Sequence, residues 1–347
     1  MATLYPPEQN DEATAELAVF FPSVQEFFRK LAKLVMSAGL DLLLVAAMAI
    51  LLGVLLIAQH DVVQIAESSV LYPIGMMLFL LATRMGLWGY RHFRNQNGTL
   101  SLGAVFLQTL RDWIPFILID FIYENLHDLS RHFQTHDVAA TLMRWDTALF
   151  GVEPTLWIQR YFNPTVTDFM AFAYGLYFLL PLVIMYLLSY RNQRSKLREM
   201  ILALSLSFLI AFVGFTLFPC SPPRYFIENQ FTHPSHLYGL YLFNFLQAQW
   251  DNHSAVRSGA FPSLHVTTSA IALIYAFRLR NKSRVDRWLY WIYVPLVVSL
   301  WVSTVYLRHH WFIDIFAGWI LALLCCWMAP TLSRLWEELR GLLDERA

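Results

Sequence analysis

The sequence predicts an all-α polytopic membrane protein with about eight transmembrane helices. Three properties of the 347-residue chain indicate this class. Hydrophobic residues make up 57% of it, charged residues make up only 14%, and mainly apolar windows of about twenty residues recur along it. The formal net charge is zero, so no basic field predicts binding to nucleic acid.

Eight apolar windows mark the expected spans. They cover residues 37–58, 70–90, 102–123, 166–189, 199–218, 261–278, 288–306 and 311–330. The third window is the weakest because Arg111, Asp112 and Asp120 interrupt it, and we assign no function to Arg111 or Asp112. The windows predict four segments: a polar or interfacial amino-terminal segment (1–36), extra helices with the start of a bundle (37–123), a catalytic region (124–330) and a tail (331–347).

Basic residues between the spans predict how the chain crosses the membrane. They collect before the first span, after the second, fourth and sixth spans, and in the tail; Arg194, Arg280 and Arg340 are examples. By the positive-inside rule this face is cytoplasmic, and so are both termini. An even number of spans must separate two cytoplasmic turns, which is why the third window is kept. The other face then looks into the periplasm, the exterior or a lumen, as expected for a cell inner membrane or a eukaryotic endomembrane.

Two histidines and one carboxylate lie at the predicted outer ends of helices. His265 follows the run Phe261-Pro262-Ser263-Leu264, and His310 precedes Asp314 by four residues. Residues four apart share a helix face, so the carboxylate can hold the imidazole in the tautomer that leaves its other nitrogen free to attack. Such a set predicts phosphoryl transfer through a covalent phosphohistidine.

His309 is the alternative nucleophile, but its five-residue gap to Asp314 moves it off the shared face. Cysteine and histidine spacings show no metal-binding pattern. We therefore expect a site that needs no metal and no other cofactor.

The histidine runs resemble the signatures of a known family. Phe261-Pro262-Ser263-Leu264-His265 and Ser303-Thr304-x5-His310-x3-Asp314 are similar to the second and third signatures of the type 2 phosphatidic acid phosphatase superfamily. Within it, the run from Phe218 to Tyr225 and the doubled His309-His310 are closest to the inositolphosphotransferase, or inositol phosphorylceramide synthase, branch. The resemblance covers about residues 145–330. It implies that the last six spans form a six-helix bundle, with two extra helices in front.

The resemblance also implies a role for each matching residue. His310 matches the nucleophile, Asp314 its orienting carboxylate, and His265 the acid that protonates the leaving alcohol. The residues expected to bind phosphate are Ser263, Ser303, Thr304, Arg224 and Arg308. The two arginines would replace the lysine-and-arginine first signature, which this chain lacks, because a planar guanidinium can grip two phosphate oxygens.

Two further residues are candidates for contact with a polyol headgroup. Asp146 belongs to the run Trp145-Asp146-x3-Phe150-Gly151, which also resembles the inositolphosphotransferase branch, and Arg257 lies just before the second signature. The alternative for Asp146 is a helix cap.

The expected function is transfer of a phospholipid headgroup, through a phosphohistidine, at the extracytoplasmic membrane face. The partners are then a phospholipid or lipid-phosphate substrate, a lipid alcohol acceptor and the surrounding membrane lipids. A lipid-phosphate phosphatase, which hydrolyses phosphatidate or prenyl pyrophosphate at the same site, is the alternative. A non-catalytic transporter or scaffold is a third hypothesis. It is disfavoured because a scaffold has no need of both histidines and the carboxylate.

Overall fold

The computed structural model describes residues 38–58, 67–93, 101–129, 137–232, 234–253 and 261–345, together with residue 26. Within these ranges every regular element is a helix, and none is a strand. Apart from Glu26, the predicted segment 1–36 lies outside the described residues, and so does the candidate headgroup residue Arg257.

Each predicted apolar window coincides with a helix. The long helices are α2 (Leu40–Ala58), α3 (Glu67–Phe93), α4 (Leu102–Leu129), α7 (Pro164–Tyr190), α8 (Arg194–Leu217), α11 (Leu264–Leu279), α12 (Arg284–Tyr306) and α13 (Phe312–Glu345). Five of them, α4, α7, α8, α12 and α13, contain apolar stretches long enough to cross a bilayer. Shorter apolar stretches lie in α2, α3 and α11. The chain is therefore an all-α, multi-pass membrane protein.

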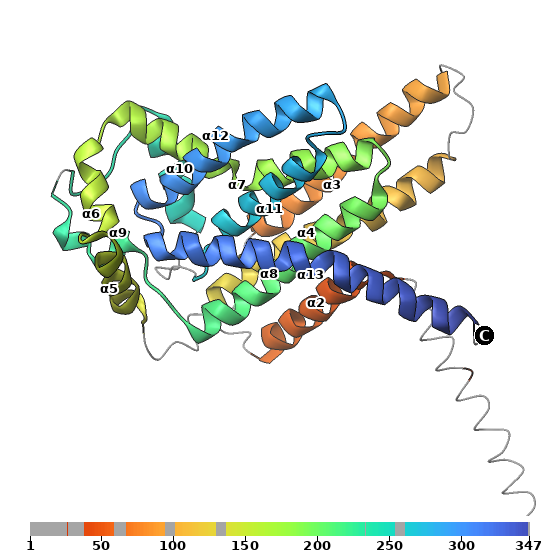
Figure 1. Ribbon diagram of the computed structural model, residues 1–347, viewed down its shortest axis with the longest axis horizontal. Helices are drawn as coiled ribbons and strands as arrows, with labels where there is room; N and C mark the ends of the chain where they lie inside the picture. The colour runs from red at the N-terminus through yellow and green to blue at the C-terminus, as the bar shows by residue number, and fades with distance from the viewer. Residues whose placement is uncertain are drawn as a thin grey trace, which may run out of the picture.

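Helix α11 lies in the centre of the bundle and contacts α7, α8, α12 and α13 (Figure 1). Small buried residues such as Ser269, Ala272 and Ala276 let the neighbouring helices approach it closely. Helix α4 packs on α8, and both α2 and α3 pack on α4. The two helices at the front of the chain thus join the bundle through α4, and α2 also packs on α8.

Paired charges hold one end of this bundle together. The Arg194 guanidinium donates two hydrogen bonds to Asp112, at 2.9 and 2.7 Å, which ties the start of α8 to α4. Arg111 donates to the carbonyl oxygen of Ala38, next to the start of α2. These contacts explain how the third window accommodates charge: both residues serve to join helices.

Short elements cover the opposite end. They are α5 (Ala139–Phe150), α6 (Pro154–Ile158), η2 (Gln159–Tyr161), α9 (Pro223–Phe226), η3 (Glu228–Gln230) and α10 (Leu242–His253). Figure 1 shows α5, α6 and α9 gathered at the left of the bundle. Asp168, in the first turns of α7, accepts hydrogen bonds from the backbone amides of Tyr241 and Phe243 and so anchors the start of α10.

The last helix is longer than expected. Helix α13 runs without a break to Glu345, past residue 330, where the sequence analysis ended the last span and began a tail. The apolar residues Leu335, Leu339 and Leu342 continue the helical spacing beyond Pro330, so the helix has no local reason to end there.

Candidate active site

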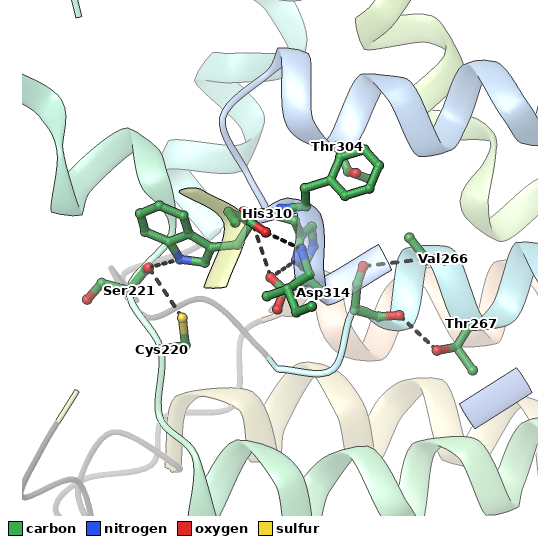
Figure 2. A network of polar contacts seen from close by, with 12 residues as sticks. Cys220, Ser221, Val266, Thr267, Thr304, His310 and Asp314 are labelled. Atoms are coloured by element: carbon green, nitrogen blue, oxygen red, sulfur yellow. Dashed lines mark hydrogen bonds and ion pairs between the residues drawn. The ribbon is translucent and has the colours of Figure 1, made fainter. Parts of the chain in front are cut away.

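His310 and Asp314 lie together where α13 begins. The Nδ1 atom of His310 is 3.2 Å from Oδ2 of Asp314, and the same oxygen accepts a hydrogen bond from the backbone amide of Trp311 at 3.2 Å (Figure 2). Both side chains are buried, with 5% and 2% of their surfaces exposed. Because Nδ1 faces the carboxylate, Nε2 is the nitrogen left to meet a substrate.

The turn before His310 is tight. The backbone amides of His309 and His310 both donate to the carbonyl oxygen of Thr304, at 3.0 and 3.1 Å. Arg308 adopts a left-handed conformation with φ of 63°, which costs a non-glycine residue on the order of 1 kcal/mol. This turn brings the chain from the end of α12 directly into α13.

The Arg308 side chain helps to fix that conformation. Its two terminal nitrogens donate to the carbonyl oxygens of Ser235 and Pro234, at 2.7 and 2.8 Å, and its guanidinium lies 3.7 Å from the centre of the Phe231 ring. Burial lowers the pKa of Arg308 to about 10, so the group stays charged at neutral pH. The structure therefore places this predicted phosphate ligand against the loop that follows η3.

His265 lies in the first turn of α11, facing His310. The centres of the two imidazole rings are 5.6 Å apart. Ser263 caps this helix, since its hydroxyl accepts a hydrogen bond from the backbone amide of Val266 at 3.4 Å. The two histidines that the sequence analysis assigned to catalysis are thus brought together although 45 residues separate them.

A glycine lets the starts of α11 and α13 approach each other. A Cβ atom on Gly318 would lie 2.9 Å from Cβ of Val266 and 3.0 Å from the carbonyl oxygen of Ser263. The Thr267 hydroxyl also donates to the carbonyl oxygen of Gly318. Two helix amino termini, whose partial positive charge favours anions, consequently flank the histidine pair.

Arg224 supplies a nearby cation. Its backbone amide donates to the carbonyl oxygen of Arg308 at 3.0 Å. The Nε and one terminal nitrogen of its guanidinium are buried and have no hydrogen-bond partner among the described residues. Burial, and after it the charge of Arg224, hold the pKa of His309 well below its usual value, so His309 is neutral at pH 7. A half-buried cation with two buried, unused donors beside the histidines suits an anionic group of a substrate.

Ser303 and Thr304 are less available than expected. Both are fully buried, and their hydroxyls donate to carbonyl oxygens of their own helix, those of Leu300 and Trp301, at 2.6 and 2.7 Å. They help to form the end of α12, where the Thr304 carbonyl oxygen accepts hydrogen bonds from the backbone amides of His309 and His310.

Asp146, a residue of α5, caps the start of helix α13. It is fully buried, and its carboxylate accepts hydrogen bonds from the backbone amides of Phe312 and Ile313, at 2.7 and 2.8 Å. Burial, and to a lesser extent the charge of Glu153, raise the pKa of Asp146 to about 7. The geometry favours the cap over the headgroup contact, although the capped helix is α13 and not a neighbour in sequence.

Sequence reasoning missed two tyrosines of α7. The Tyr174 ring stacks with the rings of His265 and His309, with centres 4.4 and 4.7 Å away. The Tyr177 ring lies 4.2 Å from His265. In the sequence both tyrosines look like ordinary aromatic residues of a membrane span. The one indication of a shared role is their spacing of three residues, which places them on the same helix face.

Comparison with known proteins gives two relatives with related names. Over 232 residues the chain is 24% identical to the phosphoinositol dihydroceramide synthase of Bacteroides thetaiotaomicron, a match that covers 61% of this chain and 73% of the relative. Over 74 residues it is 36% identical to the inositol phosphorylceramide synthase catalytic subunit AUR1 of Saccharomyces cerevisiae; this match covers 20% of the chain and only 16% of the relative. No solved structure matches.

The family model of the PAP2 superfamily matches residues 140–328, which is more than half of the chain and includes both histidine signatures. The protein belongs to the PAP2 superfamily.

Proposed function

We propose that this membrane protein transfers the headgroup of a phospholipid to a lipid alcohol through a phosphohistidine on His310. The observation that carries the proposal is the pair of His310 and Asp314, 3.2 Å apart, facing His265 in a member of the PAP2 superfamily. This arrangement supplies a nucleophile, its orienting carboxylate and a proton donor without any further group, so we also propose that the reaction needs no metal ion.

In the first half-reaction, Nε2 of His310 attacks the phosphorus of the phospholipid. A phosphorus–nitrogen bond forms while the bond to the glyceride oxygen breaks, and His265 gives its proton to that oxygen. Asp314 stabilises the positive charge that develops on the imidazole. The products are a released lipid alcohol and the headgroup held on His310 through its phosphate.

In the second half-reaction, the acceptor hydroxyl takes the position of the alcohol that left. His265, now neutral, removes the hydroxyl proton, and the acceptor oxygen attacks the phosphorus. The phosphorus–nitrogen bond breaks and His310 is restored. Each histidine thereby returns to its starting protonation state after one turnover.

Arg224 is the main proposed ligand of the phosphate oxygens. Its unused buried donors and the amino termini of α11 and α13 favour the negative charge that spreads over these oxygens in the transition state. We propose Arg308 as a second contributor, through its charge and through its hold on the loop at residues 234 and 235. We also propose that Ser263 and the backbone next to it, at the start of α11, bind the phosphate oxygens.

The names of the relatives point to a substrate class. One is named for phosphoinositol and dihydroceramide, the other for inositol phosphorylceramide. We therefore propose phosphatidylinositol as the donor to test first and a ceramide-type lipid alcohol as the acceptor.

We further propose that the site faces away from the cytoplasm. It lies at the end of the bundle where α11 and α13 begin, whereas the basic turns at Arg194 and Arg278 lie at the opposite end. The positive-inside rule assigns that basic end to the cytoplasm, with both termini.

Purified protein given labelled phosphatidylinositol, with and without ceramide, tests the transferase proposal. Label in a new ceramide-dependent lipid supports it, and His310→Ala should form none. Water-soluble inositol phosphate formed without regard to ceramide, or free phosphate from labelled phosphatidate, would instead support the phosphatase. A scaffold or transporter would convert neither substrate.

A further inference from the structure

His265 and His309 share an aromatic neighbour. Tyr174 of α7 is buried, with 7% of its surface exposed. Its ring is close to parallel with both imidazoles, at interplanar angles of 24° to His265 and 20° to His309. Tyr177, one turn further along the same helix, adds a second ring against His265, tilted by 47°.

These contacts bear on the acid and base role of His265. Backbone bonds fix where α11 starts, but they do not fix how the His265 ring is turned about its side-chain bonds. Packing against the stacked ring of Tyr174 and the tilted ring of Tyr177 restricts that rotation. It also holds the ring in position relative to His310, 5.6 Å away. A proton donor has to meet the leaving oxygen within hydrogen-bond distance, so this orientation matters for the rate.

We propose that Tyr174, supported by Tyr177, is a positioning residue for the reaction: its ring orients His265 toward the leaving alcohol and keeps His309 packed beside the site. The proposal rests on the proposed function, because it requires His265 to be the proton donor. It assigns the effect to the ring of Tyr174 and not to its hydroxyl.

The test compares two substitutions on two substrates. Tyr174→Leu removes the ring, and Tyr174→Phe keeps it. The substrates are phosphatidylinositol, whose alcohol leaves poorly without a proton, and a nitrophenyl ester of inositol phosphate, whose leaving group needs none. The rates compared are single-turnover rates of leaving-group release, because His265 serves both substrates alike in the second half-reaction. We expect Tyr174→Leu to lower the release of the lipid alcohol from phosphatidylinositol by about 10²-fold, the scale of a misplaced catalytic group, and to lower the release of nitrophenol from the ester far less. Tyr174→Phe should stay within a few-fold of the parent on both.

Tyr293→Leu is the matched control for the loss of a buried tyrosine. Tyr293 is 3% exposed, and its hydroxyl donates to the carbonyl oxygen of Leu180 within α7. Its substitution should lower the thermal stability but leave the ratio of the two rates unchanged. If Tyr174→Leu does not fold, Tyr177→Leu removes the other ring from His265 and should change that ratio in the same direction.

His265→Ala separates a failure of this proposal from a failure of the proposed function. If His265→Ala lowers both rates equally, His265 is not the proton donor and the proposed mechanism is wrong. If His265→Ala is selective but Tyr174→Leu and Tyr177→Leu lower both rates equally, only the positioning role is overturned. A loss in Tyr174→Phe as large as in Tyr174→Leu would overturn it too. We expect Tyr174→Leu to cost little further activity when added to His265→Ala.

Discussion

The two ends of the helix bundle use arginine in opposite ways. At one end three guanidinium groups meet carboxylates: Arg194 meets Asp112 at 2.7 Å, Arg191 meets Asp286 at 2.6 Å, and Arg278 meets Glu199 at 3.0 Å. At the other end the guanidinium of Arg224 keeps buried nitrogens without a partner among the described residues. Paired charges join helices, whereas buried guanidinium nitrogens without a hydrogen-bond partner cost free energy that a bound anion would recover.

A protein carboxylate holds the start of α13 at the histidine end. This carboxylate, Asp146 from a distant helix, satisfies the first amides of α13. His310 is thereby placed at a helix start held by protein side chains on one side and facing His265 on the other. The arginines of the paired end join helices, whereas at the histidine end Arg224 keeps donors that we propose bind the anionic group of a substrate.

Labelling should separate the two ends completely. Cysteines introduced at Asn192 and Ser283, in turns of the paired end, should not react with an impermeant thiol reagent applied from outside, whereas a cysteine at Ser235 should react fully. All three native cysteines are buried, so the background should be low. Labelling at Ser283 from outside intact cells or sealed vesicles would reverse the proposed orientation.

Removing charge should affect the two ends differently. We expect Arg224→Gln to lower kcat/KM by about 10²- to 10³-fold, the cost of losing one donor to a developing negative charge. Arg224→Lys should recover part of the lost kcat/KM, because lysine keeps the positive charge but lacks the planar set of donors that can bind two phosphate oxygens at once. Steady-state kinetics on the donor lipid would measure both.

Arg194→Gln is the control at the paired end. It should leave the rate near normal and lower the free energy of unfolding by about 1 to 3 kcal/mol, since Asp112 loses the two hydrogen bonds that Arg194 donates. An Arg224→Gln protein with a normal rate would move phosphate binding to Arg308 or to the helix termini.

Asp146 should make stability depend on pH. Its pKa is about 7 in the folded protein, above the ordinary value of 3.8, so between these values the folded state binds more protons than the unfolded state. Stability should therefore fall as pH rises from about 4 to 7, by at most about 1.4 kcal/mol per pH unit. Asp146→Asn, which resembles the protonated acid, should flatten that slope. Thermal unfolding in detergent across this range would check it, and an unchanged slope would contradict the assignment.

Local patterns predicted much of this molecule because the features concerned are local. Apolar windows located the long helices, and the four-residue spacing placed His310 against Asp314. The sequence analysis expected α13 to end early because it took the window length as the helix length.

The partners that the sequence analysis did not predict all lie in distant parts of the chain. Asp146 caps a helix 166 residues away, and Arg308 bonds carbonyl oxygens more than 70 residues before it. Tyr174 contacts His265 and His309 because α7 packs against both α11 and α12. No spacing within one segment encodes such partners. The sequence therefore suggested Arg224 and Arg308 as phosphate ligands, but it could not show that the Arg308 side chain bonds the loop at residues 234 and 235.

The central claim is that His310 carries the phosphate covalently, and trapping that intermediate tests it most directly. In His265→Ala, a nitrophenyl ester of labelled inositol phosphate should still react in the first half-reaction, while the second slows for want of a base. Label should then accumulate on the protein in an acid-labile, base-stable form, as expected of a phosphorus–nitrogen bond, and peptide mapping should place it on His310. It should be absent from the His265→Ala, His310→Ala double variant. Label that survives the removal of His310, or that maps to His309, would contradict the account.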